Sequence, residues 1–172
     1  MERKARLFGH PIHPMLIVFP LGLLATAVIF DIIALAAGAT YLFSASYWMI
    51  AAGVIGGLIS AVFGLIDWLA IPSGTRAKQI GLWHGGGNVV VTLLFALSWI
   101  LRRPSPANPS AAAVGLALVG VVLALVTGWL GGELVDRLGV GVDPGAHLDA
   151  PSSLSGRPAS SDEIKPNLRR VA

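Results

Sequence analysis

The chain has 172 residues, of which 55% are hydrophobic and only 12% are charged. Soluble domains carry roughly 25% charged residues, so a soluble protein of this composition would lack the polar groups needed to cover its surface. The absence of cysteine excludes disulfides, thiolate metal ligands and cysteine nucleophiles, and the net charge of +3 comes from basic residues at the chain ends and between apolar stretches, a pattern typical of membrane topology rather than nucleic-acid binding.

Four apolar stretches are long enough to cross a bilayer, which takes roughly 20 residues of helix. They run over residues 15–37, 47–71, 83–101 and 111–134. Because a helix satisfies its own backbone groups in lipid and the connections are short, the sequence predicts an all-α integral membrane protein, an antiparallel four-helix bundle within residues 15–138. Residues 1–14 are expected to form a basic interfacial segment, and residues 139–172, rich in Pro, Ser, Gly and charge, a mostly disordered tail.

The positions of Lys and Arg predict the orientation of the bundle. Basic residues gather before the first stretch, between the second and third, and in the tail, whereas the first connection has none. Arg102 and Arg103, after the third stretch, oppose this pattern. Since cytoplasmic segments carry an excess of Lys and Arg, we expect both termini in the cytoplasm.

The first stretch follows the sequence His-Pro-Ile-His-Pro at positions 10–14. Proline is favoured at the first helical position, so we expect Pro14 there and His13 at or near the N-cap. Pro20, inside the stretch, is expected to kink the helix because it removes a backbone donor.

Asp31 is an acid within the predicted span. A charged carboxylate at mid-membrane costs roughly 2.5–3.5 kcal/mol, so Asp31 should face the bundle interior. The hydroxyls of Ser46 and Ser98 are the expected partners. A structural hydrogen bond and a role with ions or protons are equally open.

Small residues recur every three or four positions in the second and fourth stretches, so they share one helix face. The two sets are Gly53, Gly57, Ser60 and Gly64, and Gly120, Ala124, Thr127 and Gly131. Small residues let helices approach closely in membranes, which predicts helix packing. Room for a flat cofactor is the alternative interpretation.

Because successive helices alternate in direction, most of the ionisable residues that lie near the ends of the spans are expected at the same membrane face. These residues, with one amide, are His10, His13, Asp67, His84, Asn88 and Glu133. Facing histidines in a helix bundle can ligate a haem iron, and the candidate cofactor-binding residues are His13, His84, His10 and Asn88. A divalent metal is the other cofactor considered, with candidate ligands His10, His13, His84, Asp67 and Glu133. A proton relay through Asp67, His84 and Glu133, or purely structural roles as helix caps and ion pairs, are further alternatives.

Four motifs resemble the bacterial family called "domain of unknown function 2231". They are Gly-His-Pro-Ile-His-Pro-Met-Leu-Ile-Val-Phe-Pro at 9–20, Gly-Leu-Ile-Asp-Trp at 64–68, His84 with Asn88, and Gly-Trp-Leu-Gly-Gly-Glu-Leu at 128–134. The resemblance covers about residues 7–142 and implies a four-helix inner-membrane protein without an assigned activity. Some members occur near respiratory or redox proteins, which favours haem or a metal. Leu138 stands where the family often has a histidine, so a site that needed that histidine would be lost here.

Three functions therefore stay open: a haem-binding or redox protein, a metal-binding protein, and a structural or assembly subunit of a membrane complex. A hydrolytic enzyme is disfavoured because no serine has a nucleophile-elbow context and no phosphate-binding loop is present. The expected partners are membrane lipid and other membrane or redox subunits, and nucleic acid is not expected. The oligomeric state is left open.

Overall fold

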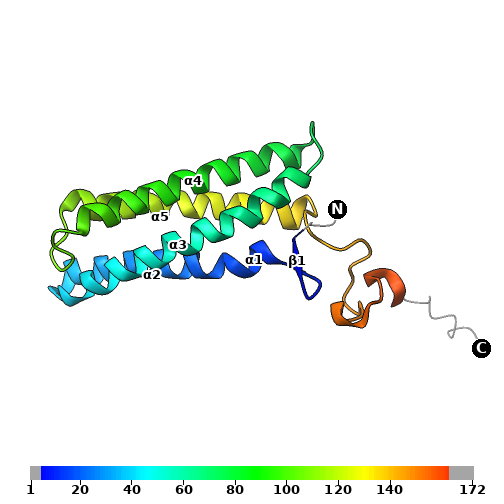
Figure 1. Ribbon diagram of the computed structural model, residues 1–172, viewed down its shortest axis with the longest axis horizontal. Coiled ribbons are helices and arrows are strands. Elements are labelled where there is room, and N and C mark those ends of the chain that lie inside the picture. Colours follow the sequence, from blue (N-terminus) through cyan, green and yellow to red (C-terminus); the bar gives the residue numbers. More distant parts are fainter. Residues whose placement is uncertain (1–4, 163–172) are drawn as a thin grey trace, which may run out of the picture.

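The computed structural model describes residues 5–162, and its main part is a bundle of long helices (Figure 1). A short antiparallel hairpin comes first, and turns and short helices follow the bundle. The elements are β1 (Arg6–Leu7), β2 (His10–Pro11), α1 (Ile12–Leu16), α2 (Val18–Ala37), α3 (Tyr41–Ala70), α4 (Arg76–Arg102), α5 (Ala111–Gly132), the π-helix η1 (Glu133–Arg137) and the 3₁₀-helices η2 (Ser153–Ser155) and η3 (Ala159–Asp162). Residues 1–4 and 163–172, with the basic residues of both chain ends, lie outside the described residues.

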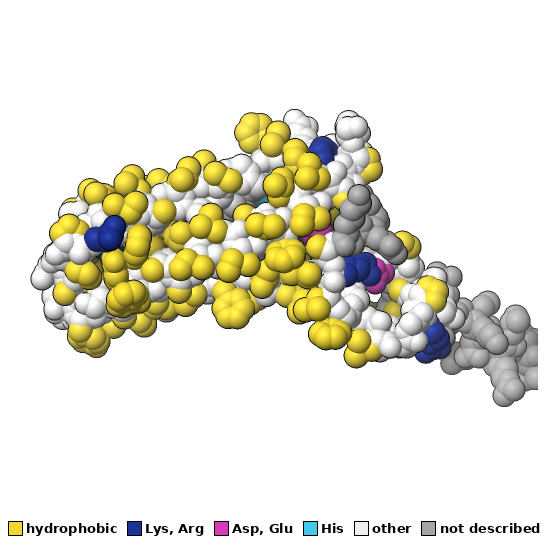
Figure 2. Space-filling model, in the orientation of Figure 1, with side chains coloured by type: hydrophobic (Ala, Val, Ile, Leu, Met, Phe, Trp, Pro, Cys, Tyr) yellow, Lys and Arg dark blue, Asp and Glu magenta, His cyan; other side chains and the backbone are white. Residues whose placement is uncertain are grey.

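Four helical segments are long and apolar enough to cross a membrane: Ile12–Ala37, Tyr41–Ala70, Arg76–Arg102 and Ala111–Arg137. They alternate in direction, which confirms the predicted all-α antiparallel bundle (Figure 1). Within it α2 packs chiefly on α3, and α4 on α5, so the bundle consists of two helical hairpins. Apolar side chains cover its outer surface, as lipid contact requires (Figure 2).

α3 and α4 begin well before the predicted spans. An apolar stretch marks only the part of a helix that lies inside the hydrocarbon layer. The helix itself extends beyond that layer for as long as its backbone hydrogen bonds continue. α4 starts where the Thr75 hydroxyl accepts a hydrogen bond from the Lys78 backbone N–H (3.1 Å), and α2 ends at Gly38, whose φ of 70° suits glycine.

The first crossing is interrupted at Ile17, between α1 and α2. The ring of Pro20 cannot donate to the carbonyl four residues earlier, so the break falls where the kink was expected. The expectation that Pro14 takes the first helical position is wrong, because Pro14 is the third residue of α1. Pro11 is the N-cap and α1 begins at Ile12, so His13 lies in the first helical turn.

The small-residue faces receive side chains of neighbouring helices, as the packing prediction requires. A Cβ on Gly53 would lie 2.6 Å from Leu24 Cδ2, and one on Gly120 would lie 2.8 Å from Phe95 Cε2. The central core that these contacts close consists of Leu24, Ala27, Val28, Ile50, Val91, Phe95 and Ala117.

Candidate functional site

Two groups of polar side chains interrupt the apolar bundle, one near each end. The histidine cluster, defined as His13, Ser60, His84, Asn88 and Thr127, lies toward the end where both termini emerge (Figure 1). The ion-pair cluster, defined as Asp31, Ser46, Ser98 and Arg102, lies toward the opposite end. All four crossing segments contribute to each cluster when the backbone partners are counted.

His13 extends from α1 onto the small-residue face of α3. Its Nδ1 lies 3.0 Å from the Ser60 carbonyl oxygen and 3.2 Å from the Ser60 hydroxyl. A Cβ on Gly64 would lie 2.9 Å from His13 Cε1, so the ring fits only because position 64 is glycine. Since a carbonyl oxygen only accepts, this contact places the proton on Nδ1 and the lone pair on Nε2.

His84, on α4, is held in the same way by α5. Its Nδ1 lies 2.8 Å from the Thr127 carbonyl oxygen, and a Cβ on Gly131 would lie 3.0 Å from its Cε1. Asn88 Nδ2 donates to the His84 carbonyl oxygen (2.9 Å) and lies 3.4 Å from His84 Nε2. The Thr127 hydroxyl donates to Asn88 Oδ1 (3.1 Å), which closes a ring of contacts around His84. Nε2 is again the nitrogen with a lone pair.

The two imidazoles meet across the seam between the helical hairpins. Their ring centres are 6.4 Å apart and their planes are nearly perpendicular, at 89°. Two imidazoles on opposite sides of one metal ion have ring centres roughly 6 Å apart, because each metal–nitrogen bond is about 2.0 Å and each nitrogen lies about 1.2 Å from its ring centre. The observed separation suits both a metal-bridged pair and a simple edge-to-face contact.

Two of the other candidate ligands, His10 and Glu133, contact residues outside the histidine cluster. His10 is exposed on β2, with Nε2 3.2 Å from Ser153 Oγ in the tail. Glu133 forms an ion pair with Arg76 at 2.6 Å, and Asp67 is 8% exposed near the end of α3. Within residues 5–162, no three His, Cys, Asp or Glu side chains are placed to hold one metal ion. The histidines in contact are therefore His13 and His84, with Asn88 beside the second.

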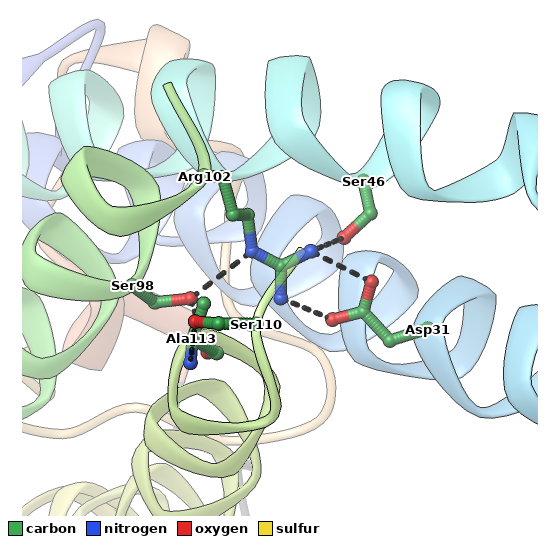
Figure 3. A network of polar contacts seen from close by, with 6 residues as sticks. All are labelled: Asp31, Ser46, Ser98, Arg102, Ser110 and Ala113. Atoms are coloured by element: carbon green, nitrogen blue, oxygen red, sulfur yellow. Dashed lines mark hydrogen bonds and ion pairs between the residues drawn. The ribbon is translucent and has the colours of Figure 1, made fainter. Parts of the chain in front are cut away.

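The ion-pair cluster joins the two hairpins at the other end of the bundle (Figure 3). Arg102 Nη1 donates to Asp31 Oδ1 at 2.9 Å and Nη2 to Oδ2 at 2.5 Å, and both side chains are essentially unexposed. Arg102 also donates to Ser46 (3.3 Å) and Ser98 (3.2 Å). Ser98 in turn donates to the Ala113 carbonyl on α5 at 2.6 Å.

The expected partners of Asp31 need correction. Ser46 and Ser98 do belong to its cluster, but the side chain that binds the carboxylate is Arg102, which we had assigned to a loop as a topology signal. The sequence did contain a clue. Asp31 and Arg102 both lie toward the same end of their helices, and a buried acid in lipid needs a cation more than a hydroxyl. Thr127 was also missed as a partner of His84, because its contribution is mainly a backbone carbonyl.

Comparison with known proteins gives one match. Residues 9–144 match the family model described as "Predicted membrane protein (DUF2231)". The matched range contains all four crossing segments and both polar clusters. No curated protein and no solved structure is significantly similar to the chain.

Proposed function

The chain belongs to the DUF2231 family of predicted membrane proteins, and within that family we propose that it is a redox protein that binds haem b between His13 and His84. The observation that carries the proposal is the shared arrangement of the two imidazoles. Each one places Nδ1 on a main-chain carbonyl of the neighbouring helix, and the two ring centres lie 6.4 Å apart with nearly perpendicular planes.

This hydrogen bonding is what metal-bound histidines show in other proteins. A ligating imidazole almost always donates its second N–H to a carbonyl or carboxylate, which fixes the tautomer and orients the ring. Here the Ser60 and Thr127 carbonyls supply that support, so Nε2 is the ring nitrogen through which each histidine would bind a metal.

Haem suits the donor set better than a bare divalent ion. Zinc sites use three or four protein ligands, whereas a haem iron takes four nitrogens from its macrocycle and needs only axial ligands from the protein. Gly85 and Gly86 follow His84, and a Cβ on either would meet no atom within 4 Å. When bound, a haem held by His13 and His84 would supply one-electron transfer.

An absorption spectrum tests the proposal directly. The protein, expressed with ample haem and purified in mild detergent, should show a Soret band that shifts on reduction. His13→Ala and His84→Ala should each abolish it. His10→Ala is the matched control and should keep it, because His10 contacts the tail. A colourless wild-type protein would overturn the proposal.

The same preparation tests the other two functions. A stoichiometric divalent metal without a Soret band would indicate a metal-binding protein. A colourless, metal-free protein that co-purifies with stoichiometric partners would indicate a structural or assembly subunit.

The inner membrane, with both termini in the cytoplasm, is the proposed location. The burial of Arg102 against Asp31 supports this orientation, because a neutralised arginine inside the bundle no longer counts as a loop charge. Arg103 is then the remaining basic residue near that end within the described part of the chain.

A further inference from the structure

The hairpin before the bundle and the chain after it pack against each other outside the membrane-spanning helices. We define the hairpin–tail unit as residues 5–11 together with residues 143–162. Arg6 forms an ion pair with Asp143, and Ser153 Oγ donates to the Phe8 carbonyl at 3.2 Å. A Cβ on Gly9 would lie 2.8 Å from Ser153 Cβ, so the tail packs closely on the turn of the hairpin.

Phe8, at the tip of that turn, has an unusual backbone conformation. Its φ is +50°, the left-handed region in which a bulky residue is strained and in which Gly, Asn or Asp is usually found. Gly9 follows with a φ of +83°, as a tight two-residue hairpin turn requires. Phe8 is nevertheless 72% exposed, so its side chain makes little contact within the described chain.

A second large apolar side chain lies beside this tip. Leu154 follows Ser153, the residue that bonds the Phe8 carbonyl, and it is 74% exposed. Leu7 and Leu148 of the same unit are exposed as well. Exposed apolar surface of this kind indicates a contact with something else.

The position of the unit indicates that this contact is lipid. α1 begins directly after β2, and Met15, Val18 and Phe19 on the first crossing are all exposed. An open, mostly apolar depression lined by His10, Pro11, Pro14 and Met15 connects the hairpin to that surface. Figure 2 shows hydrophobic side chains running along the bundle and continuing toward its tail-bearing end. The apolar tip thus continues the lipid-facing surface of the helices.

We infer that the hairpin–tail unit docks on the lipid headgroup layer, with the side chains of Phe8 and Leu154 inserted into the bilayer interface. Apolar side chains of interfacial segments reach roughly 5–10 Å into the headgroup and acyl boundary. Insertion of an aromatic ring stabilises the tip and offsets the backbone strain at position 8.

The absence of cysteine allows a clean depth measurement. Phe8→Cys, Leu154→Cys and the exposed polar control Asp149→Cys are each labelled with a nitroxide in vesicles of phosphatidylcholine and phosphatidylglycerol. The labels at 8 and 154 should be more accessible to oxygen, which partitions into lipid, and less accessible to a water-soluble nickel complex than the label at 149. If the ratio of oxygen accessibility to nickel accessibility at 8 and 154 equalled the ratio at 149, the inference would be overturned. Protection from both reagents would also overturn it, because it would indicate a protein partner or a second copy.

A second pair of variants separates insertion from folding. Asparagine tolerates a positive φ, so Phe8→Asn should preserve the helix content measured by circular dichroism. It should nevertheless reduce the depth of the nitroxide label at position 154 in the bilayer. Phe8→Trp should preserve the depth at 154. An unchanged depth in Phe8→Asn would show that the ring does not anchor the unit.

Discussion

Arg102 is the residue of this bundle whose burial costs most free energy, because its charged guanidinium is as fully buried as the apolar core residues. Two parallel contacts to Asp31 satisfy its charge, and two serines take further donors. Removing both charges from water is expensive, so the pair is weak evidence for stability by itself. Removing one member of the pair should be strongly destabilising, because the remaining charge would be buried without a partner.

Arg102→Met should therefore destabilise the protein by about 3–5 kcal/mol, the usual cost of an unpaired buried charge. Arg103→Met, the exposed neighbour, is the control and should cost far less. The double variant Asp31→Leu/Arg102→Met should recover most of the loss. Reversible unfolding in detergent or bicelles measures all three, and equal effects at 102 and 103 would contradict the structure.

At the histidine cluster, Thr127→Val tests the ring of contacts around His84. The substitution removes the hydroxyl that donates to Asn88 but keeps the carbonyl that holds His84 Nδ1. We expect a loss of about 1–2 kcal/mol, since a partly buried amide oxygen loses its donor. Haem occupancy should also fall, because Asn88 would no longer be fixed beside the imidazole.

Thr92→Val is the matched control for this change. The Thr92 hydroxyl bonds only the Asn88 carbonyl of its own helix (2.8 Å), so its removal should leave stability and haem occupancy nearly unchanged. Equal losses in the two variants would show that the cluster does not depend on the Thr127 hydroxyl.

At the scale of the helices, glycine determines where each ring lies. α3 and α5 each present a glycine under an imidazole: Gly64 under His13 and Gly131 under His84. The same helices use Gly53 and Gly120 against Leu24 and Phe95. One repeated small-residue pattern therefore closes the apolar core and, about three turns further along each helix, positions the histidines.

Gly131→Ala and Gly64→Ala should each displace an imidazole and lower haem occupancy, because the new Cβ would lie about as close as atoms permit to Cε1 of the ring. Gly128→Ala is the control. Its Cβ would meet no atom within 4 Å, and alanine favours a helix by about 1 kcal/mol over glycine. Spectral titration with haem and thermal unfolding compare the three. Normal haem binding in Gly131→Ala would count against the proposed site.

At the scale of the whole molecule, polar clusters join the two helical hairpins near both ends, and an apolar core fills the space between them. The bidentate ion pair between Asp31 and Arg102 holds the two hairpins together more strongly than the ring contact between His13 and His84. We therefore expect the seam to open more easily at the histidine cluster, where a cofactor would enter, than at the ion-pair cluster.

The proposed orientation is tested by single cysteines in the connecting segments. Asn108→Cys, between α4 and α5, should react with a membrane-impermeant maleimide in intact bacterial cells. Ser73→Cys, between α3 and α4, should react only after the cells are permeabilised. The reverse pattern would place both termini outside.

The sequence alone determined the four crossings and their alternating direction, because twenty apolar residues in lipid have few options besides a helix and short connections force neighbours to be antiparallel. It also grouped His13 and His84 at one end of the bundle, which follows from that topology. Tertiary structure decided the partners. Whether Arg102 is a loop charge or a buried counter-ion, and whether His84 bonds a backbone carbonyl, depends on helix rotation and on the depth of single side chains. Those are fixed by close packing between helices, where positions differing by one residue face in different directions.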